Sequence, residues 1–404
     1  MENINFKSLN VLVVDDDNYI RELLTIALHG LGVKRLTTAT NGEEALRVYD
    51  GRADDIDVLL CDLNMPGMDG VEFIRHLAQR QYSGGIVMIS GEDGRILRTA
   101  ERLARAHNLN ILGVLGKPMT RLALAEVLGR LGAEQAKGRQ EPTSPITAEE
   151  VRQGIQGDEL VPFFQPKVEI ATRRVAGVES LARWKHRERG MLGPDTFIPV
   201  AEQHGLINDL TDAIFAKAMK QGAVWRAAGL DLKVAVNISV DSLDRLDLPA
   251  FILACASEYG MDASQVILEV TESRLMKNLT AALEILTRLS LKGISLSIDD
   301  FGTGYSSLEQ LQRLPFVELK IDKAFVLGAA RDSAARAILE SSVELGKKLS
   351  MTTVAEGVET QEDWDLVAKL GCDLVQGYFV AKPMPGENVR EWITEWYLGG
   401  KSSS

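Results

Sequence analysis

The chain has 404 residues, of which 45% are hydrophobic and 25% are charged, and its formal net charge is −12. This length exceeds what one hydrophobic core usually supports, so two domains are expected. The acidic balance argues against a nucleic-acid polymer as partner, because such binding needs a basic surface. It does not exclude a small phosphodiester, since bound divalent cations reverse the local charge of a carboxylate-rich pocket.

The sequence predicts neither a membrane span nor a secretory leader. No run approaches the ~18 consecutive apolar residues that a bilayer requires, and the start MENINFKSLN lacks a basic segment followed by an apolar one. The cysteines at 61, 255 and 372 show neither metal-binding nor disulfide spacing. We therefore expect a cytoplasmic protein without a membrane partner.

The first half of the chain alternates short apolar runs with amphipathic helical stretches, which predicts a doubly wound parallel sheet. The runs cover residues 11–15, 58–62, 85–90 and 111–116. Sites in such sheets lie at the carboxyl ends of the strands, and the polar residues there are Asp15, Asp16, Asp62, Ser90 and Lys117. Each alone is commonly a turn or cap residue. Together, three carboxylates for a hard cation, a hydroxyl and a lysine indicate a phosphoryl site.

The runs VVDDD, CDLNMPGMDG, MISGE and GKP make residues 8–131 similar to response-regulator receiver domains, which have a flavodoxin-like fold. The resemblance implies that Asp62 accepts phosphate from a sensor histidine kinase. It also implies a Mg²⁺ site formed by Asp15, Asp16, Asp62 and the Asn64 carbonyl, with Ser90 and Lys117 contacting the phosphoryl oxygens. Val114 departs from the family, because many receivers carry an aromatic switch residue there.

A linker is predicted over residues 132–146, where apolar periodicity stops and charged residues, prolines and small residues take over. The stretch before it, LALAEVLGRLGAEQAKGR, has good helix formers. The sequence therefore leaves open whether the connection is a coil or a continuation of the preceding helix.

The second domain, predicted over residues 147–398, contains eight apolar runs typical of strands. They cover residues 161–168, 175–184, 232–239, 266–272, 296–302, 317–322, 351–359 and 373–381. From the third run onward the spacing leaves room for helices, as an eight-stranded (β/α)8 barrel of the TIM type requires. Only about five residues separate the first two runs, too few for a crossover helix. One antiparallel strand is therefore expected in the barrel.

Oxygen-bearing side chains lie at or near the ends of these runs, where a barrel gathers them at one mouth. They are Glu179, Asn237, Glu269, Asp299 and Asp300. A set without histidine or cysteine favours Mg²⁺ or Mn²⁺, and two such ions can activate water and neutralise a phosphate. Lys320 can hold the water or the developing charge, and Glu356 can act as a base or a further ligand.

Other interpretations remain open for single residues. Asn237 after an apolar run is often a turn former. Glu179 and Arg183, four positions apart, can form a surface ion pair. Asp299 and Asp300 are harder to explain in this way, because adjacent acids at the end of an apolar strand repel each other unless a cation or donor intervenes.

The domain resembles the EAL family of cyclic-di-GMP phosphodiesterases through QPKV, ESLARW, NIS, EVTE, DDFGTGYSSL, KID, AEGVE and QGY. The resemblance implies metal binding by Glu179, Asn237, Glu269, Asp299 and Asp300. It implies that Lys320 and Glu356, with Glu179, serve catalysis, and that Glu272 anchors the glycine-rich loop. The positions it implies around substrate and metal are Gln165, Leu181, Arg183, Asp322, Glu359 and Gln376. Ser180 replaces the usual alanine of the signature triplet, for which we expect only a packing adjustment.

The leading hypothesis is a two-component response regulator whose output is Mg²⁺- or Mn²⁺-dependent hydrolysis of cyclic-di-GMP to linear pGpG, modulated by phosphorylation of Asp62. We expect two ions in the second domain and one in the first, and a homodimer or larger homo-oligomer. The alternatives are a catalytically silent cyclic-di-GMP receptor and an adaptor driven by the receiver domain. No GGDEF-type stretch is present, so synthesis of cyclic-di-GMP is not expected.

Overall fold

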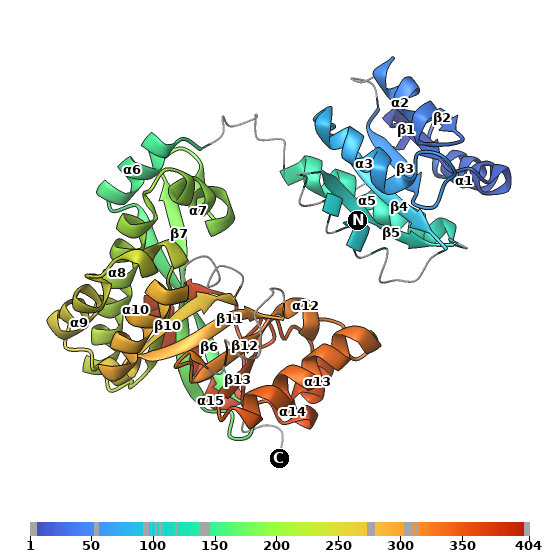
Figure 1. Cartoon of the computed structure of the whole chain (residues 1–404). Coiled ribbons are helices and arrows are strands. Elements are labelled where there is room, and N and C mark those ends of the chain that lie inside the picture. Colours follow the sequence, from blue (N-terminus) through green and yellow to red (C-terminus); the bar gives the residue numbers. More distant parts are fainter. Residues whose placement is uncertain are drawn as a thin grey trace. The chain divides into compact units, whose positions relative to one another are not determined.

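The computed structural model divides the chain into two compact units, residues 1–144 and 145–404 (Figure 1). It describes residues 6–51, 56–91, 97, 99–101, 103, 104, 107, 109–117, 119–137, 146–272, 279–302, 311 and 313–399. The glycine-rich loop after Gly302 and residues 138–145 of the predicted linker therefore lie largely outside the described residues. Each unit is considered separately below.

The first unit is a parallel sheet, as the sequence predicts, with five strands in the order β2-β1-β3-β4-β5; the strand at residues 35–39 was not among the predicted runs. Its strands are β1 (Asn10–Val14), β2 (Arg35–Ala39), β3 (Val58–Asp62), β4 (Gly85–Ser90) and β5 (Asn110–Gly116). The short helix η1 (Phe6–Ser8) precedes them, and the longer helices are α1 (Asn18–Leu31), α2 (Gly42–Asp50), α3 (Gly70–Gln79) and α5 (Arg121–Lys137).

Alternate side chains of the central strands enter two separate cores, one on each face of this sheet. On β1, Leu12 and Val14 pack in one core, while Val11 and Val13 pack in the other. Because successive strand residues point to opposite faces, this pattern requires apolar layers on both sides. Only the strand ends remain available for polar side chains.

The second unit is an eight-stranded barrel with one antiparallel strand, which confirms the predicted fold. Its strands are β6 (Leu160–Glu169), β7 (Val175–His186), β9 (Lys233–Asn237), β10 (Val266–Thr271), β11 (Ser295–Phe301), β12 (Glu318–Ile321), β13 (Thr352–Ala355) and β14 (Leu374–Val375). β6 pairs antiparallel with both β7 and β14 and so closes the barrel. β8 (Gly190–Leu192) and β15 (Met384–Pro385) extend its edges.

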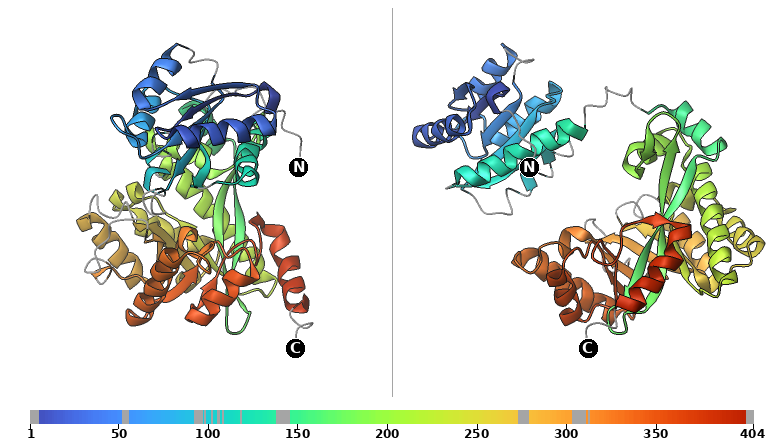
Figure 2. Two further views of the ribbon diagram at one scale, coloured as in Figure 1. Left: turned by 90° about the vertical axis from the view of Figure 1, so that its right-hand side faces the viewer. Right: turned by 180° about the vertical axis from the view of Figure 1, so that it is seen from behind.

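Helices surround this barrel, as the two further views show (Figure 2). They are α6 (Ala148–Gln156), α7 (Pro194–Gln203), α8 (Ile207–Ala227), α9 (Leu248–Glu258), α10 (Leu279–Leu291), α12 (Lys323–Val326), α13 (Ser333–Lys348), α14 (Gln361–Leu370) and α15 (Val389–Gly399). The short 3-10 helices are η3 (Val240–Asp244), η4 (Ala263–Gln265) and η6 (Gly386–Asn388).

Residues on the barrel strands alternate between an apolar exterior and a charged interior. Leu319 and Ile321 of β12 pack in the core beneath the helices, whereas Glu318 and Lys320, which alternate with them, are buried and charged. Barrel interiors are usually filled by branched apolar side chains. Charges in this interior must therefore be compensated by one another or by bound ions.

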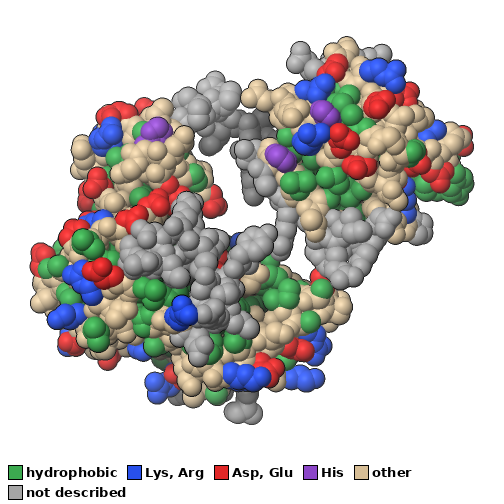
Figure 3. Space-filling model, in the orientation of Figure 1, with side chains coloured by type: hydrophobic (Ala, Val, Ile, Leu, Met, Phe, Trp, Pro, Cys, Tyr) green, Lys and Arg blue, Asp and Glu red, His purple; other side chains and the backbone are tan. Residues whose placement is uncertain are grey.

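The connection between the units begins as a helix, because α5 runs to Lys137 and so includes the first residues of the predicted linker. No helix among the described residues combines the length and hydrophobicity required to cross a bilayer. On the face of the barrel unit drawn in Figure 3, acidic and basic side chains are interspersed.

Ser180 lies on the outer face of the barrel, opposite Phe164 of β6, whose ring packs against Trp225. Its side chain is buried, and its hydroxyl has no hydrogen-bond partner among the described residues. A buried hydroxyl without a partner costs about 1 kcal/mol or more.

Ser180→Ala should therefore raise the free energy of unfolding by about 1 kcal/mol and the thermal midpoint by about 2–4 °C. Ser242→Ala is the matched control, because buried Ser242 donates to Asn208 Oδ1 at 2.7 Å and its loss should lower the midpoint. Calorimetric unfolding of both variants checks the prediction. A lower midpoint for Ser180→Ala would contradict it.

Candidate functional site

The carboxyl ends of the receiver-like sheet bring together the polar residues predicted there. Lys117 Nζ lies 2.7 Å from Asp15 Oδ2 and 2.6 Å from Asp62 Oδ2. Oxygens of Asp15, Asp16 and Asp62 lie within 4.8 Å of one another, close enough to share a cation. Asp17 is not part of this group, and its side chain caps α1 by accepting the Tyr19 N–H.

The remaining predicted residues lie around the same strand ends. The Asn64 N–H donates to Asp62 Oδ1 at 3.3 Å. Ser90 is buried at the end of β4. Burial alone would lower the pKa of Lys117, but its hydrogen bonds to Asp15 and Asp62 reverse the effect and raise that pKa. Lys117 is therefore a permanent cation beside Asp62.

A larger cluster centres on Lys320, whose side chain is 1% exposed inside the barrel. Its Nζ lies 3.3 Å from Glu179 Oε2, 2.9 Å from Glu269 Oε2, 3.0 Å from Asp299 Oδ1 and 2.7 Å from Glu356 Oε1. Side chains from four different strand positions thus converge on one ammonium group. These acids are the residues that the sequence analysis expected at one mouth.

Carboxylate oxygens form two overlapping groups that can each hold a cation. Glu179, Glu269 and Asp299 supply one group, and Asp299, Asp300 and Glu356 supply the other, each within 4.8 Å. Asp299 belongs to both groups. A pair of ions sharing one carboxylate fits this arrangement.

A register shift in β11 explains how two consecutive acids reach the same mouth. In a regular strand, Asp299 and Asp300 would point to opposite faces. The pairing of β11 with β12 is instead irregular between Ile298 and Phe301, and Asp300 has a φ of 56°, in the left-handed region. An inserted residue re-aims the side chains beside it, so both carboxylates join the cluster.

Amide side chains orient the cluster from the side of the reversed strand. Gln376 Nε2 donates to Glu179 Oε2 at 2.6 Å and to Gln165 Oε1 at 3.0 Å, and Gln165 Nε2 donates to the Ala381 carbonyl at 2.9 Å. Gln376 Oε1 is buried without a partner among the described residues. A buried acceptor of this kind needs a cation or a hydrogen-bond donor such as water as its partner.

Asn237 is exposed at the end of β9, and its Nδ2 donates to Glu179 Oε1 at 2.7 Å. Because the nitrogen of the Asn237 amide faces Glu179, its oxygen is the atom that can bind a cation. Glu272 Oε2 accepts the Gly302 N–H at 2.9 Å, at the start of the glycine-rich loop; residues 303–310 lie outside the described part.

The other residues predicted to line the substrate pocket differ in their surroundings. Leu181 and Arg183 lie on the same face of β7 as Glu179, and the Arg183 guanidinium is 5.9 Å from the Phe163 ring centre. Arg183 does not form the alternative ion pair with Glu179 among the described contacts. Asp322 caps α12 by accepting the Ala324 N–H. Glu359 is exposed, and within the described part of the chain its side chain makes no ion pair with the cluster.

Two buried charges were assigned no role from the sequence, although the structure places them next to the cluster. Lys167 Nζ lies 3.2 Å from Glu269 Oε1 and 2.8 Å from Glu318 Oε1. The sequence did contain a hint of these two charges, Lys167 and Glu318. Each lies within a predicted apolar strand, two positions from the site residue Gln165 or Lys320.

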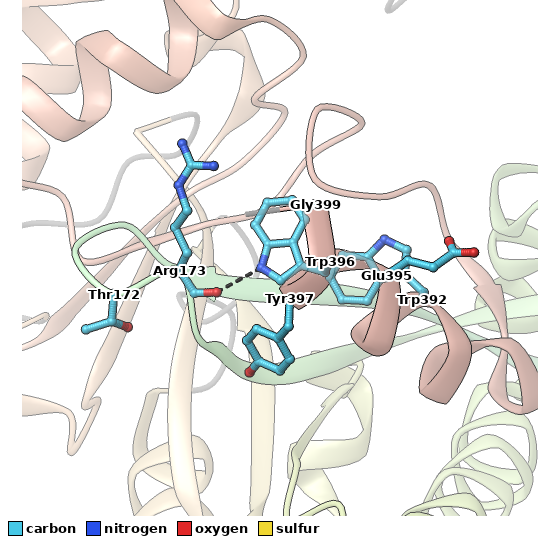
Figure 4. A pocket seen from close by; sticks show the side chains of 7 residues that line it. All are labelled: Thr172, Arg173, Trp392, Glu395, Trp396, Tyr397 and Gly399. Carbon is cyan, nitrogen blue, oxygen red and sulfur yellow. Dashed lines mark hydrogen bonds between the residues drawn. The ribbon is translucent and has the colours of Figure 1, made fainter. Parts of the chain in front are cut away.

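A separate pocket of about 520 Å³ lies at the opposite end of the barrel, between α15 and the turn joining β6 to β7 (Figure 4). The stacked rings of Trp392 and Trp396, 5.5 Å apart, form part of its wall. None of the predicted site residues belongs to the described lining of this pocket.

Comparison with known proteins finds two different families in separate parts of the chain. The EAL domain pattern matches residues 148–383, and the response regulator receiver domain pattern matches residues 11–128. The chain belongs to the EAL domain family. Its receiver domain precedes the EAL domain.

Relatives cover either the whole chain or its EAL domain. Cyclic di-GMP phosphodiesterase RocR of Pseudomonas aeruginosa is 34% identical over 96% of this chain and 99% of its own length. The bifunctional diguanylate cyclase/cyclic di-GMP phosphodiesterase MucR of that organism is 40% identical over 59% of this chain and 35% of its own. The structure "PaMucR Phosphodiesterase, c-di-GMP complex" is 40% identical, with a TM-score of 0.58 over 60% of this chain and 98% of that chain.

The carboxylates of the EAL site differ in their readiness to ionise. Burial and the neighbouring Glu179 charge raise the pKa of Glu269 to about 8. Burial would also raise the pKa of Glu179, but Lys320 and the Gln376 hydrogen bond lower it to about 2. Burial and Asp299 raise the pKa of Asp300 to about 6. One lysine is therefore insufficient to keep every acid of the cation-free site ionised at neutral pH.

Divalent-cation binding to the EAL site should release protons, because carboxylate ligands must be deprotonated. Glu269, with a pKa of about 8, is mostly protonated at pH 7 without a cation. Apparent Mn²⁺ affinity should therefore rise from pH 6 through pH 8 and level off only about one pH unit above the pKa of Glu269. Calorimetric titrations at pH 7 in PIPES and in Tris should give different heats, of which Glu269 accounts for about one released proton and Asp300 and Glu356 for any further ones.

The titration is made on a chain carrying Asp15→Asn, which weakens the receiver site. Adding Glu269→Gln removes one ionising group and should reduce the buffer dependence by about one proton. Equal heats in both buffers before that second change would contradict the assignment.

Proposed function

We propose that this chain is a Mg²⁺- or Mn²⁺-dependent phosphodiesterase that hydrolyses cyclic-di-GMP to linear pGpG. The observation that carries the proposal is the pair of carboxylate groups sharing Asp299 around Lys320. RocR and MucR bear the name of cyclic di-GMP phosphodiesterases, which supports the same substrate for this chain.

The donor set fits divalent cations of the magnesium type. Its oxygens come from carboxylates and an amide, and Gln376 Oε1 is a buried acceptor without a described partner. Glu179, Asn237, Glu269 and Asp299 would hold one ion, and Asp299, Asp300 and Glu356 the other. Bound cations supply Lewis-acid chemistry by polarising a water molecule and neutralising phosphate oxygens.

The side chains of the chain itself hold the substrate and move the protons. Hydrolysis joins a water oxygen to phosphorus and breaks the bond from phosphorus to one ribose 3′ oxygen, which takes up a proton and becomes the 3′ hydroxyl of pGpG. Glu356 is placed to take the proton of the water, and its pKa is raised well above the ordinary value, mainly by burial. The Lys320 ammonium stabilises the negative charge that develops on the phosphate oxygens.

The direct test is hydrolysis of cyclic-di-GMP by the full chain in Mg²⁺, followed by chromatography. Linear pGpG should appear, and it should be absent with Ca²⁺, which favours larger and more irregular coordination, and with Glu179→Ala. Tight binding without turnover would favour the silent receptor instead. Neither binding nor turnover would favour the adaptor.

Lys320 can be tested by substitution. Lys320→Ala removes the ammonium that contacts four carboxylates and should lower kcat by about 10²–10³-fold. Lys348→Ala, which removes an exposed lysine paired with Glu344, is the control and should leave kcat unchanged. Near-normal turnover of a folded Lys320→Ala chain would refute the role of this lysine.

Regulation is proposed to begin at Asp62, as the phosphate acceptor from a sensor histidine kinase. Asp62 lies beside Lys117 in a group of three carboxylates that can hold one cation. Phosphorylation adds charge at this position and can alter the packing of the surrounding strand ends. The expected homodimer or larger homo-oligomer remains a prediction.

The role of Asp62 as phosphate acceptor can be tested with a chemical phosphate donor. Acetyl phosphate should change the rate of cyclic-di-GMP hydrolysis by the unmodified chain, and Asp62→Asn should abolish that change without altering the basal rate. Asp50→Asn, at an exposed residue that pairs with Arg80, should retain the response. A response that persists in Asp62→Asn would move the phosphosite elsewhere, and no response in the unmodified chain would contradict the regulatory proposal.

A further inference from the structure

Lys167 and Glu318 form a buried ion pair directly below the EAL site. The Lys167 side chain is 2% exposed and that of Glu318 is 8% exposed. Lys167 Nζ lies 2.8 Å from Glu318 Oε1 and 3.2 Å from Glu269 Oε1. The pair therefore contacts a proposed metal ligand without belonging to either carboxylate group.

Strand periodicity explains this position. Lys167 follows Gln165 by two residues on β6, and Glu318 precedes Lys320 by two residues on β12. Residues two apart share a face of a strand. The pair thus occupies the next layer of the barrel interior, below the residues that form the mouth.

The two oxygens of Glu269 have different partners as a result. Oε1 accepts from Lys167 at 3.2 Å, while Oε2 lies 2.9 Å from Lys320 within the cluster. A lysine at each oxygen restricts rotation of the Glu269 carboxylate. Groups that hydrogen-bond a metal ligand from behind set its orientation, and their loss commonly weakens metal binding by about 10–100-fold.

We propose that Lys167, held by Glu318, is a positioning residue that fixes the Glu269 carboxylate for divalent-cation binding. The inference rests on the proposed function, because it concerns the same site. Lys167 and Glu318 carry opposite charges, so removing both leaves the net charge of the interior unchanged. What Glu269 loses in that case is the contact of its Oε1 with Lys167 Nζ.

A purely structural role predicts a different result. Replacing a buried ion pair by apolar side chains of similar size is often neutral or stabilising. If the pair only filled the barrel, its replacement would leave cation affinity unchanged. The two roles are therefore distinguished by metal binding rather than by stability.

The test uses the full chain with Asp15→Asn, which weakens the receiver site, and adds Lys167→Met together with Glu318→Leu. Mn²⁺ binding is measured by calorimetry and folding by thermal unfolding. We expect a folded protein whose Mn²⁺ dissociation constant rises about 10–100-fold. The control replaces the Arg245–Asp212 ion pair, 2.8 Å long and outside the cluster, by Arg245→Met with Asp212→Asn, and should leave that constant unchanged.

Lys167→Met alone provides a second variant in case the double replacement does not fold. It removes the contact to Glu269 and makes the interior more negative, which by itself favours a cation, so weaker Mn²⁺ binding reports the lost positioning. Unchanged Mn²⁺ affinity in either folded variant overturns the proposal.

Hydrolysis separates this proposal from the proposed function. In the double variant the Mg²⁺ concentration for half-maximal rate should rise, while kcat at saturating Mg²⁺ changes less. If the unmodified chain binds Mn²⁺ but does not hydrolyse cyclic-di-GMP, the proposed function fails, and calorimetry still decides the role of Lys167.

Discussion

Lys320 places one ammonium group among four carboxylates in the closed interior of a barrel. Buried charges are costly unless they are compensated, and one positive charge cannot offset four negative ones. Burial raises the pKa values of Glu269 and Glu356, and the neighbouring acids raise them further. The same imbalance makes the site a strong attractor for divalent cations, so its stability and its proposed chemistry have one electrostatic origin.

The backbone around Lys320 is arranged to bring these acids together. Strand β6, which runs antiparallel to its neighbours β7 and β14, contributes Gln165 and Lys167 to the barrel interior. The register shift in β11 directs Asp299 and Asp300 to the same mouth, at the cost of a left-handed conformation at Asp300. Unusual backbone of this kind persists where the surroundings determine it strongly, and it is common at functional sites.

The periodicity of the sequence predicted both folds and the strand ends at which the polar residues meet. The hairpin was readable because about five residues between two apolar runs cannot form a crossover helix. The register shift was not readable, since period-two alternation places Asp299 and Asp300 on opposite faces. Lys167 and Glu318 were also missed, because a charged residue within a strand is normally assigned to solvent. Their burial follows only from barrel closure, which joins segments more than 100 positions apart.

The central claim is that the carboxylates around Lys320 hold divalent cations. Anomalous X-ray scattering from crystals of the full chain grown with Mn²⁺ tests it directly. We expect one anomalous peak at each carboxylate group. One group contains Glu179 and Glu269, the other contains Asp300 and Glu356, and Asp299 belongs to both. Absence of anomalous density at these residues in millimolar Mn²⁺, with Lys320 still contacting all four acids, would contradict it.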